Sequence, residues 1–187
     1  MKQTKAIERR SHLYMDDFLR SYRVLYPDAG PERIQRLMDI ISQVDRDRSP
    51  ALKTLDSDRE WKADWFQQPD QVGMMLYVDL FAGNLQGVIE HIDYFKELGI
   101  TYLHLMPLLK PRNGPNDGGY AVADYRAVNE RLGTMKQLRD LATLLHEKGM
   151  LLVIDYVMNH TAREHQWAQA ALSGDQHYQD FYLLFDD

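Results

Sequence analysis

The sequence predicts an α/β fold in which a parallel β-sheet is covered by helices and follows an all-helical N-terminal region. Two observations lead to this prediction. From about Gln71 onward, short and almost continuously apolar strands alternate with amphipathic helices, which is typical of strand–helix–strand units. Up to about Gln68, apolar residues recur at steps of three and four, which is the spacing of one face of a helix.

Three helices are expected in the N-terminal region, because three apolar stripes with helical spacing follow one another. They are made by Tyr14, Phe18, Tyr22 and Leu25, by Ile34, Leu37, Met38, Ile41 and Val44, and by Leu52, Leu55, Trp61 and Trp65. Pro31 stands where the second helix can begin, and Ser49-Pro50 has the pattern of an N-cap followed by a first-turn proline. We expect the aromatic side chains of this region to pack in a core rather than to bind a ligand.

Three strands are expected in the second region, at residues 74–81, 100–106 and 150–157. The helix between the first two strands opens at Asn84 and ends at Gly99. The next helix opens with the capping-box pair Thr134 and Gln137 and ends at Gly149. Two successive strand–helix–strand units imply a parallel sheet with both helices on one side, since such crossovers are right-handed. This arrangement fits the opening of a (β/α)8 barrel as well as a doubly wound sheet.

The connection after the second strand, residues 107–133, is long and polar. A loop of that length in a compact domain is usually functional. Gly118 and Gly119 allow a tight or left-handed turn just before the aromatic ring of Tyr120. Residues 79–83, after the first strand, do not match the glycine pattern of a dinucleotide site, so nucleotide binding is disfavoured.

Polar side chains stand at the carboxyl end of the third strand. The apolar run at residues 151–154 leads directly into Asp155, Asn159 and His160. Active sites of parallel β/α folds lie at the carboxyl ends of the strands. The sequence therefore predicts a functional site at this edge of the sheet.

Composition excludes several classes of function. The 187 residues include 28 acidic and 22 basic ones without a block rich in Lys and Arg, so nucleic-acid binding is not expected. No apolar run approaches the roughly 20 residues that a membrane-spanning helix needs. Cysteine is absent, and His160 and His165 do not share a helical face as a zinc pair would. We therefore expect a soluble, cytoplasmic protein.

Taken together, these residues carry a resemblance to a known family. The spacing of Asp155, Asn159 and His160 matches the first signature of the α-amylase superfamily of glycoside hydrolases, an aspartate followed four and five residues later by Asn-His. Residues 119–134 match the loop ahead of that signature. Residues 73–187 thus resemble the start of this family's catalytic barrel. The resemblance implies the first three strands of an incomplete (β/α)8 TIM barrel.

Within the superfamily, the chain most resembles amylosucrases and related sucrose hydrolases. The sequence segments that carry this likeness lie at residues 77–83, 102–108 and 164–185. The helical N-terminal region resembles the extra helical domain that precedes their barrel. The resemblance therefore implies three parts: a helical domain at residues 1–70, the first part of the catalytic barrel at 71–174, and the start of the insertion after the third strand at 175–187.

The resemblance assigns roles to five residues of this sequence. His160 matches the histidine that hydrogen-bonds the glucosyl unit where the bond is cleaved, and Tyr120 matches the tyrosine on which that sugar ring stacks. Asp117 matches the acidic residue that, in amylosucrases, pairs with an arginine of a later loop at the pocket floor. Asp155 and Asn159 match residues that support the site. No cofactor is implied, and no required metal, although Asn159 matches a calcium ligand of calcium-dependent amylases.

Each of these residues also has a simpler structural interpretation. Asp155 at a strand end is compatible with capping a backbone amide, and His160 with a structural histidine. Tyr120 is compatible with surface packing and Asp117 with forming a turn. Their common place at one edge of the sheet, in family order, favours the sugar-site interpretation. His104, within the second strand, is assigned to the core or to the mouth of the barrel, without a specific role.

The resemblance also implies that the catalytic carboxyl groups of the family are not among these residues. A retaining glycosidase needs two carboxyl groups about 5–5.5 Å apart, one as nucleophile and one as acid/base. In this superfamily they follow the fourth and fifth strands, whereas three strands are predicted here. No catalytic residue is therefore assigned. The catalytic carboxylates are expected beyond Asp187, and the chain alone is expected to be inactive.

Two hypotheses for function follow. In the first, the chain is the N-terminal part of a retaining, amylosucrase-like enzyme whose full-length form uses sucrose or an α-glucan and transfers or hydrolyses the glucosyl unit. An enzyme of another α-glucosidase or trehalose type is a variant of this hypothesis. In the second, the chain is a noncatalytic carbohydrate-binding or assembly module. In either case, the open edge of the third strand favours self-association.

Overall fold

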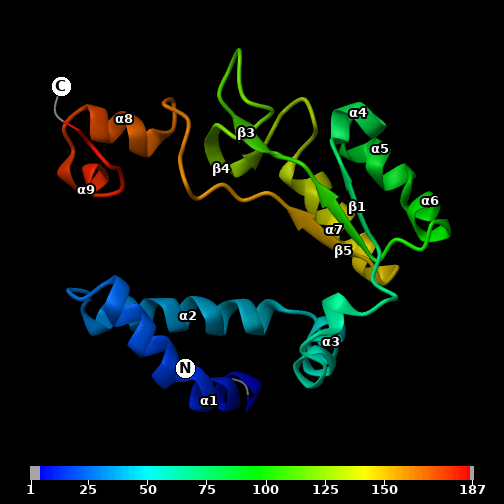
Figure 1. The fold of residues 1–187 in the computed structure, drawn as a ribbon, viewed down its shortest axis with the longest axis horizontal. Helices are drawn as coiled ribbons and strands as arrows, with labels where there is room; N and C mark the ends of the chain where they lie inside the picture. The colour runs from blue at the N-terminus through cyan, green and yellow to red at the C-terminus, as the bar shows by residue number, and fades with distance from the viewer. Residues whose placement is uncertain (1–4, 186–187) are drawn as a thin grey trace. The chain divides into compact units, whose positions relative to one another are not determined.

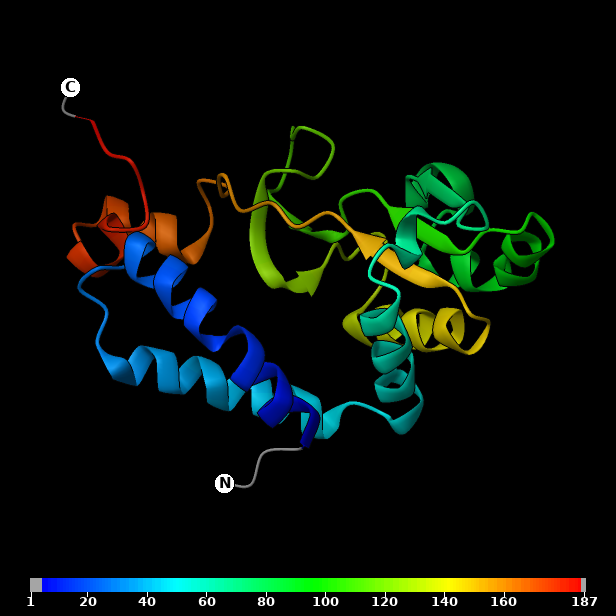
Figure 2. The same ribbon diagram turned by 60° about the horizontal axis from the view of Figure 1, so that its bottom comes forward.

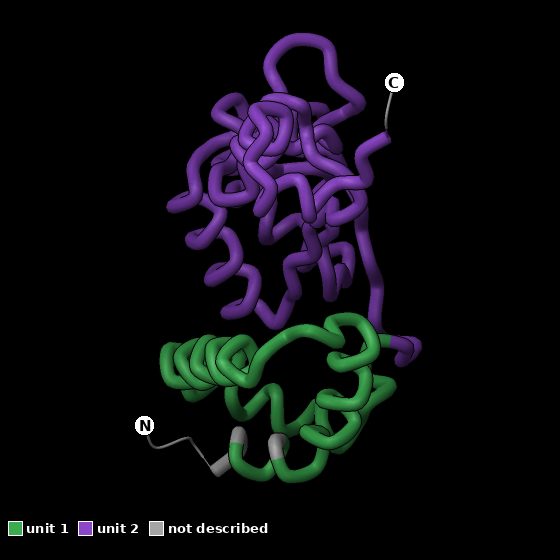
Figure 3. Tube along the Cα trace, turned by 90° about the vertical axis from the view of Figure 1, so that its left-hand side faces the viewer, with its two compact units in different colours: residues 1–66 green, residues 67–187 purple. Residues whose placement is uncertain are grey.

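The structure is a computed structural model that describes residues 5–185. The chain divides into two compact units, residues 1–66 and residues 67–187, which are coloured separately in Figure 3. The division lies close to the predicted end of the helical region. Each unit is described by itself below.

The described part of the first unit is helical throughout its regular structure. Its helices are α1 (Lys5–Leu25), α2 (Pro31–Asp47) and α3 (Pro50–Trp61), and the 3-10 helix η1 (Trp65–Gln67) lies at the unit boundary. Two of the predicted helix starts are confirmed. Pro31 and Pro50 lie in the first turns of α2 and α3, and the side chain of Ser49 accepts a hydrogen bond from the backbone N–H of Leu52 at 3.3 Å.

The prediction that the aromatic side chains of this unit pack in a core is wrong for several of them. Tyr14, Trp61 and Phe66 are 60%, 88% and 51% exposed. Among the side chains whose burial is described in this unit, the buried ones are the polar Ser42 and Asp45. A unit of this size has too little interior volume to enclose every stripe that the helical spacing produces.

Ion pairs and ring contacts connect the helices of the first unit. Arg48, which follows α2, donates from Nη2 to Asp56 of α3 at 2.7 Å. Arg10 of α1 donates from Nε to Glu60 of α3 at 2.9 Å. The guanidinium of Arg59 lies 3.9 Å above the ring of Trp65, a cation–π distance.

The second unit contains the predicted parallel sheet of three strands. β1 (Gly73–Leu76), β2 (Tyr102–Leu105) and β5 (Leu151–Ile154) pair in parallel in the order β1-β2-β5 (Figure 1). The central strand is β2, whose residue His104 lies between Met75 of β1 and Val153 of β5 in the register. The carboxyl ends of all three strands therefore meet at one edge.

Six helices belong to this unit within the described residues. They are α4 (Val78–Ala82), α5 (Leu85–Glu90), α6 (Ile92–Glu97), α7 (Met135–Glu147), α8 (Gln166–Leu172) and α9 (Gln176–Gln179). The capping box of Thr134 and Gln137 is present at the start of α7, as predicted. No helix among residues 5–185 combines the length and apolar content that crossing a membrane requires.

Three predicted elements differ from the structure. The third strand ends at Ile154 rather than at residue 157. The first strand ends at Leu76 rather than at residue 81, because residues 78–82 form α4. A short apolar run fits a buried strand and a buried helical turn equally well, so periodicity alone could not separate them. The helix expected over residues 84–98 is interrupted at His91, whose backbone (φ −96°, ψ 6°) is the boundary between α5 and α6.

One hydrophobic core fills one side of the sheet. Leu103 and Leu105 of β2 are fully buried together with Phe95 of α6 and with Leu141 and Leu145 of α7. Side chains alternate along a strand, so the residues between these leucines face away from the core. On that opposite face, Met75 is 64% and Val153 39% exposed.

An antiparallel hairpin interrupts the long connection after β2. Its strands are β3 (Leu109–Pro111) and β4 (Val122–Val128), with Leu109 opposite Val128 and Pro111 opposite Val122. This hairpin was not predicted from the sequence. Figure 2 shows the segment after β5 running without regular structure towards α8, and the backbone N–H of Ala162 in this segment donates to the carbonyl of Val122 at 2.8 Å. The hairpin therefore packs beside the segment that carries Asn159 and His160.

Candidate active site

Asp155 is the centre of the candidate site. It directly follows β5, and its two carboxylate oxygens contact two different side chains. Oδ1 lies 3.0 Å from Nε2 of His104, and Oδ2 accepts a hydrogen bond from the hydroxyl of Tyr120 at 3.1 Å. The structure thus brings together the ends of two parallel strands and the turn of the hairpin.

Elementary chemistry indicates which atoms carry the protons of the two hydrogen bonds to Asp155. An ionised carboxylate only accepts hydrogen bonds, so Nε2 of His104 carries the proton of the shared bond. Burial, followed by the hydrogen bond to Asp155, raises the pKa of the Tyr120 hydroxyl above its ordinary value of 10.0. Tyr120 therefore remains a protonated donor at neutral pH, and Asp155 accepts from both neighbours.

Asp117 shapes the turn that presents Tyr120. Its Oδ1 accepts a hydrogen bond from the backbone N–H of Ala121 at 2.8 Å, and Oδ1 of Asn116 accepts from the N–H of Gly119 at 2.9 Å. The side chain of Asp117 is exposed beyond this bond. The turn-forming interpretation of Asp117 is therefore observed, while its role at a sugar pocket stays a prediction.

Gly119 is required by the geometry of the same turn. Its φ of 100° lies in the region that favours glycine, and a Cβ at this position would lie 2.9 Å from Cβ of Pro107. The backbone can approach Pro107 this closely because no side chain intervenes. Tyr120 is the next residue in the chain, so the close approach of Gly119 to Pro107 determines where the Tyr120 ring lies.

Asn159 and His160 lie on the exposed segment after β5. Their side chains contact one another, with Asn159 Nδ2 3.3 Å from His160 Nδ1. Neither has a hydrogen bond to Asp155 or Tyr120 within the described part of the chain. The backbone of this segment is held by Tyr125 of β4, whose hydroxyl lies 2.6 Å from the carbonyl oxygen of Val157 and 3.1 Å from that of His160.

His165 has a structural role. It is 3% exposed, its ring packs against those of Tyr125 and Trp167, and its Nδ1 accepts a hydrogen bond from the backbone N–H of Trp167 at the start of α8. Burial lowers the pKa of His165 below its ordinary value of 6.5, which favours the neutral ring that this acceptor role requires. No cluster of three or more His, Cys, Asp or Glu side chains suited to a metal ion occurs among residues 5–185.

Two residues of this region, His104 and Tyr125, received no role in the site from the sequence. For His104 a signal existed, because it stands between Leu103 and Leu105 in an alternating strand. A histidine between two core leucines must point to the opposite face. For Tyr125 no local signal existed, since its partners lie 32 and 35 residues further along the chain.

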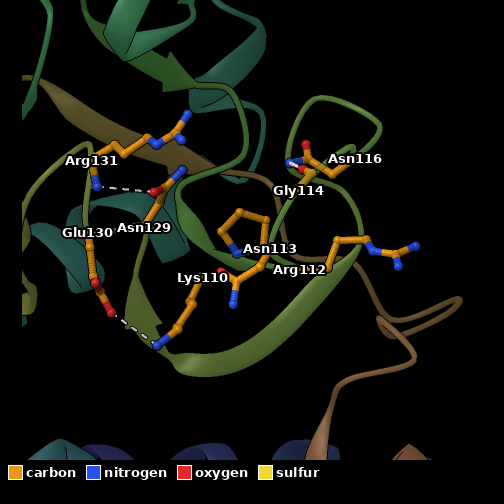
Figure 4. Close-up of a pocket in the computed structure, with 9 residues that line it drawn as sticks. Lys110, Arg112, Asn113, Gly114, Asn116, Asn129, Glu130 and Arg131 are labelled. Carbon is orange, nitrogen blue, oxygen red and sulfur yellow. Dashed lines mark hydrogen bonds and ion pairs between the residues drawn. The ribbon is translucent and has the colours of Figure 1, made fainter.

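Two cavities lie beside this group rather than at it. One, of about 540 Å³, is formed by the hairpin and the segment after β4, and Figure 4 shows Lys110, Glu130 and Arg131 on its wall. In it, Lys110 Nζ donates to Glu130 at 3.0 Å. The other, of about 380 Å³, lies between residues 77–83 and the turn at Gly118 and Gly119. Neither is lined by Tyr120, Asp155 or His160.

The chain is similar to known proteins. Residues 41–187 match the family model of the alpha-amylase catalytic domain. The chain is 38% identical over 102 residues to the oligo-1,6-glucosidase of Parageobacillus thermoglucosidasius, an alignment that covers 54% of this chain and 18% of that protein. The chain therefore spans about a fifth of the length of that relative.

Two solved structures are similar at the level of the fold. The crystal structure of Bacillus licheniformis trehalose-6-phosphate hydrolase superimposes with a TM-score of 0.58 at 33% identity, over 65% of this chain and 23% of that one. A mutant of MutB in complex with the substrate sucrose gives a TM-score of 0.55 at 31% identity, over 61% of this chain and 22% of that one. With its parallel strands, its Asp155 signature and a family match from residue 41 to residue 187, the chain belongs to the alpha-amylase family of glycoside hydrolases.

Proposed function

We propose that this chain forms the glucosyl-binding side of an active site that acts on α-glucosides. The observation that carries the proposal is the pair of hydrogen bonds by which Asp155 holds Tyr120 and His104 at the carboxyl ends of the strands. An aromatic ring packs against the apolar C–H face of a pyranose and excludes water from it. Because its hydroxyl is bound, the ring of Tyr120 has a defined orientation for this contact.

We propose that two further polar side chains bind the sugar hydroxyl groups. The exposed His160 imidazole offers a donor and an acceptor, and the carboxylate of Asp117 offers an acceptor. Both lie on segments fixed at the backbone, His160 through Tyr125 and Asp117 through its own turn. This organisation favours a site that positions a substrate.

Asp155 supports the site rather than attacking the substrate. A carboxylate nucleophile must present an oxygen to the anomeric carbon. Both oxygens of Asp155 already accept hydrogen bonds from side chains, which orient the group and lower the reactivity of its lone pairs. We therefore propose that the cleaving carboxylates are supplied by residues outside this sequence.

The donor that we propose for the full-length protein is sucrose, in an amylosucrase-like reaction. The proposal rests on the resemblance at residues 77–83, 102–108 and 164–185, and a similar solved structure contains sucrose as substrate. A second candidate is hydrolysis of another α-glucoside, favoured by the 38% identity to an oligo-1,6-glucosidase. All these donors share a nonreducing α-glucosyl unit, which is the part that Tyr120 would contact.

Isothermal titration calorimetry of the 187-residue chain with methyl α-glucoside, sucrose and isomaltose tests the proposal. We expect binding of all three ligands, loss of binding in Tyr120→Ala, and unchanged binding in Tyr94→Ala, a half-exposed tyrosine of α6 that serves as the control. Purified chain should release no fructose from sucrose. Absence of binding for every α-glucoside would refute the proposed function, and sucrose cleavage by the chain would refute the assignment of the catalytic carboxylates to other residues.

A further inference from the structure

We propose that His104 is a positioning residue of the glucosyl site, which orients Asp155 so that Asp155 in turn fixes the ring of Tyr120. This inference rests on the function proposed above for Tyr120. The relationship is a chain of two hydrogen bonds through one carboxylate, from Nε2 of His104 to Oδ1 and from the Tyr120 hydroxyl to Oδ2.

The three residues differ in how firmly their backbones are held. Asp155 begins a segment without regular structure after the edge strand β5, and Tyr120 lies in the turn between β3 and β4. His104 lies in β2, which pairs with β1 on one side and β5 on the other. The backbone of a strand paired on both sides is the least mobile of the three, so His104 is the anchor of the group.

The orientation of Asp155 needs more than one partner. The terminal torsion of an aspartate is broad and roughly two-fold, so one hydrogen bond leaves the carboxylate free to turn. Donors on both oxygens restrict this rotation. The side chains of His104 and Asp155 are 28% and 22% exposed, so water competes only in part for these bonds.

The geometry of the sheet explains why position 104 can perform this role. Leu103 and Leu105 are fully buried on the core side, which directs the histidine between them to the opposite face. His104 is opposite Val153 in the register, and Asp155 is two residues beyond Val153 on the same face. The imidazole is long enough to reach this carboxylate from the neighbouring strand.

The role requires a donor of sufficient reach and does not require a positive charge. The amide of glutamine offers such a donor, whereas leucine offers none and asparagine is too short to reach the carboxylate from β2. Hydrogen bonds to charged groups contribute more than neutral ones, so we expect a loss of about tenfold in glucoside affinity for His104→Leu. For His104→Gln we expect affinity within about threefold of the unchanged protein.

The experiment measures the affinity of the 187-residue chain for methyl α-glucoside by calorimetry in a double-mutant cycle of His104→Leu and Tyr120→Phe. If His104 acts through Asp155 on Tyr120, His104→Leu has little further effect once the Tyr120 hydroxyl is removed. Long-range ¹H–¹⁵N spectra of the histidine rings should show the Nε2-protonated tautomer at His104. His91→Leu, at an exposed histidine between α5 and α6, is the matched control and should leave affinity unchanged.

Several results would overturn the inference. They are wild-type affinity in His104→Leu, full additivity of the two substitutions, or an Nδ1-protonated ring at His104. If His104→Leu does not fold, His104→Asn and His104→Gln supply the same comparison, and equal affinities in these two variants contradict the role. Absence of glucoside binding by the unsubstituted chain would refute both the proposed function and this inference. Glucoside affinity that does not change when His104 is substituted would refute this inference alone.

Discussion

The hydroxyl of Tyr120 donates a hydrogen bond to Oδ2 of Asp155 at 3.1 Å, joining two residues that lie 35 positions apart in the chain. One belongs to the turn of the β3–β4 hairpin and the other to the end of β5. Neither segment has regular structure at that point. The bond therefore joins the hairpin to the edge of the parallel sheet through side chains.

Removing only this hydroxyl should weaken the proposed glucoside binding without abolishing it. Tyr120→Phe retains the stacking ring but frees its orientation, so we expect about a tenfold loss of affinity, near the lower end of the roughly 1.5–3 kcal/mol of a hydrogen bond to a charged group. Tyr120→Ala should lose more, because it also removes the stacking surface. Calorimetric titration with methyl α-glucoside checks both variants, and equal affinities for Phe and Ala would contradict a stacking role.

Alanine at Gly119 should be more damaging than alanine at another glycine with positive φ. Gly119 and Gly99 have φ values of 100° and 73°, but a Cβ at Gly99 meets nothing within 4 Å, whereas one at Gly119 meets Pro107 at 2.9 Å. We expect Gly99→Ala to lower the free energy of unfolding by about 1–2 kcal/mol through backbone strain alone. Gly119→Ala should cost more and also lower glucoside affinity. Urea unfolding of the two variants measures the difference, and equal losses would show that Pro107 moves aside.

Tyr125→Phe should loosen the segment that carries His160. The Tyr125 hydroxyl lies 2.6 Å from the carbonyl oxygen of Val157, so its removal leaves that carbonyl without this donor and should cost about 1 kcal/mol. Amide hydrogen exchange should accelerate over residues 157–161. Tyr156→Phe is the control, because its 59% exposed side chain has no hydrogen bond within the described residues. Identical exchange in the two variants would exclude the anchoring role of Tyr125.

Stability should fall in mildly acidic solution because of His165. Burial lowers the pKa of His165 below 6.5, so the unfolded chain binds this proton more readily than the folded chain does. The stability that the neutral ring contributes is complete above the ordinary pKa and is lost as the pH falls towards the lowered one. His165→Asn keeps an oxygen that can cap α8 and does not titrate. Denaturation at about pH 7.5 and about pH 5.5 should therefore show a larger loss for the unsubstituted chain than for His165→Asn.

The isolated chain should self-associate through its sheet. β1 and β5 are outer strands of the three-stranded sheet, and unpaired strand edges recruit further strands. Val153 of β5 is 39% exposed, and Val153→Lys should reduce association because charged side chains protect such edges. Leu172→Lys, at a 62% exposed site in α8, is the control. Sedimentation that stays monomeric at every concentration would contradict this expectation.

Features encoded within a few residues were predictable from the sequence. The N-cap of Ser49 and the capping box of Thr134 and Gln137 are present because each joins a side chain to a backbone group three residues away. The three parallel strands were recognisable from their apolar composition and from the amphipathic helices between them. Features that depend on burial were less predictable: residues 78–82 form α4 rather than the end of a strand, and Tyr14 and Leu25 of one predicted helical stripe are exposed.

For the candidate site, the sequence by itself determined that Asp155 and His160 follow the third strand, because strand order and polar residues at strand ends are local information. The tertiary structure decided which groups meet there. His104 and Asp155 are 51 positions apart, and their contact depends on β2 lying beside β5 in one register. Such pairings arise from the packing of whole elements on a common core, and no spacing within a single segment encodes them.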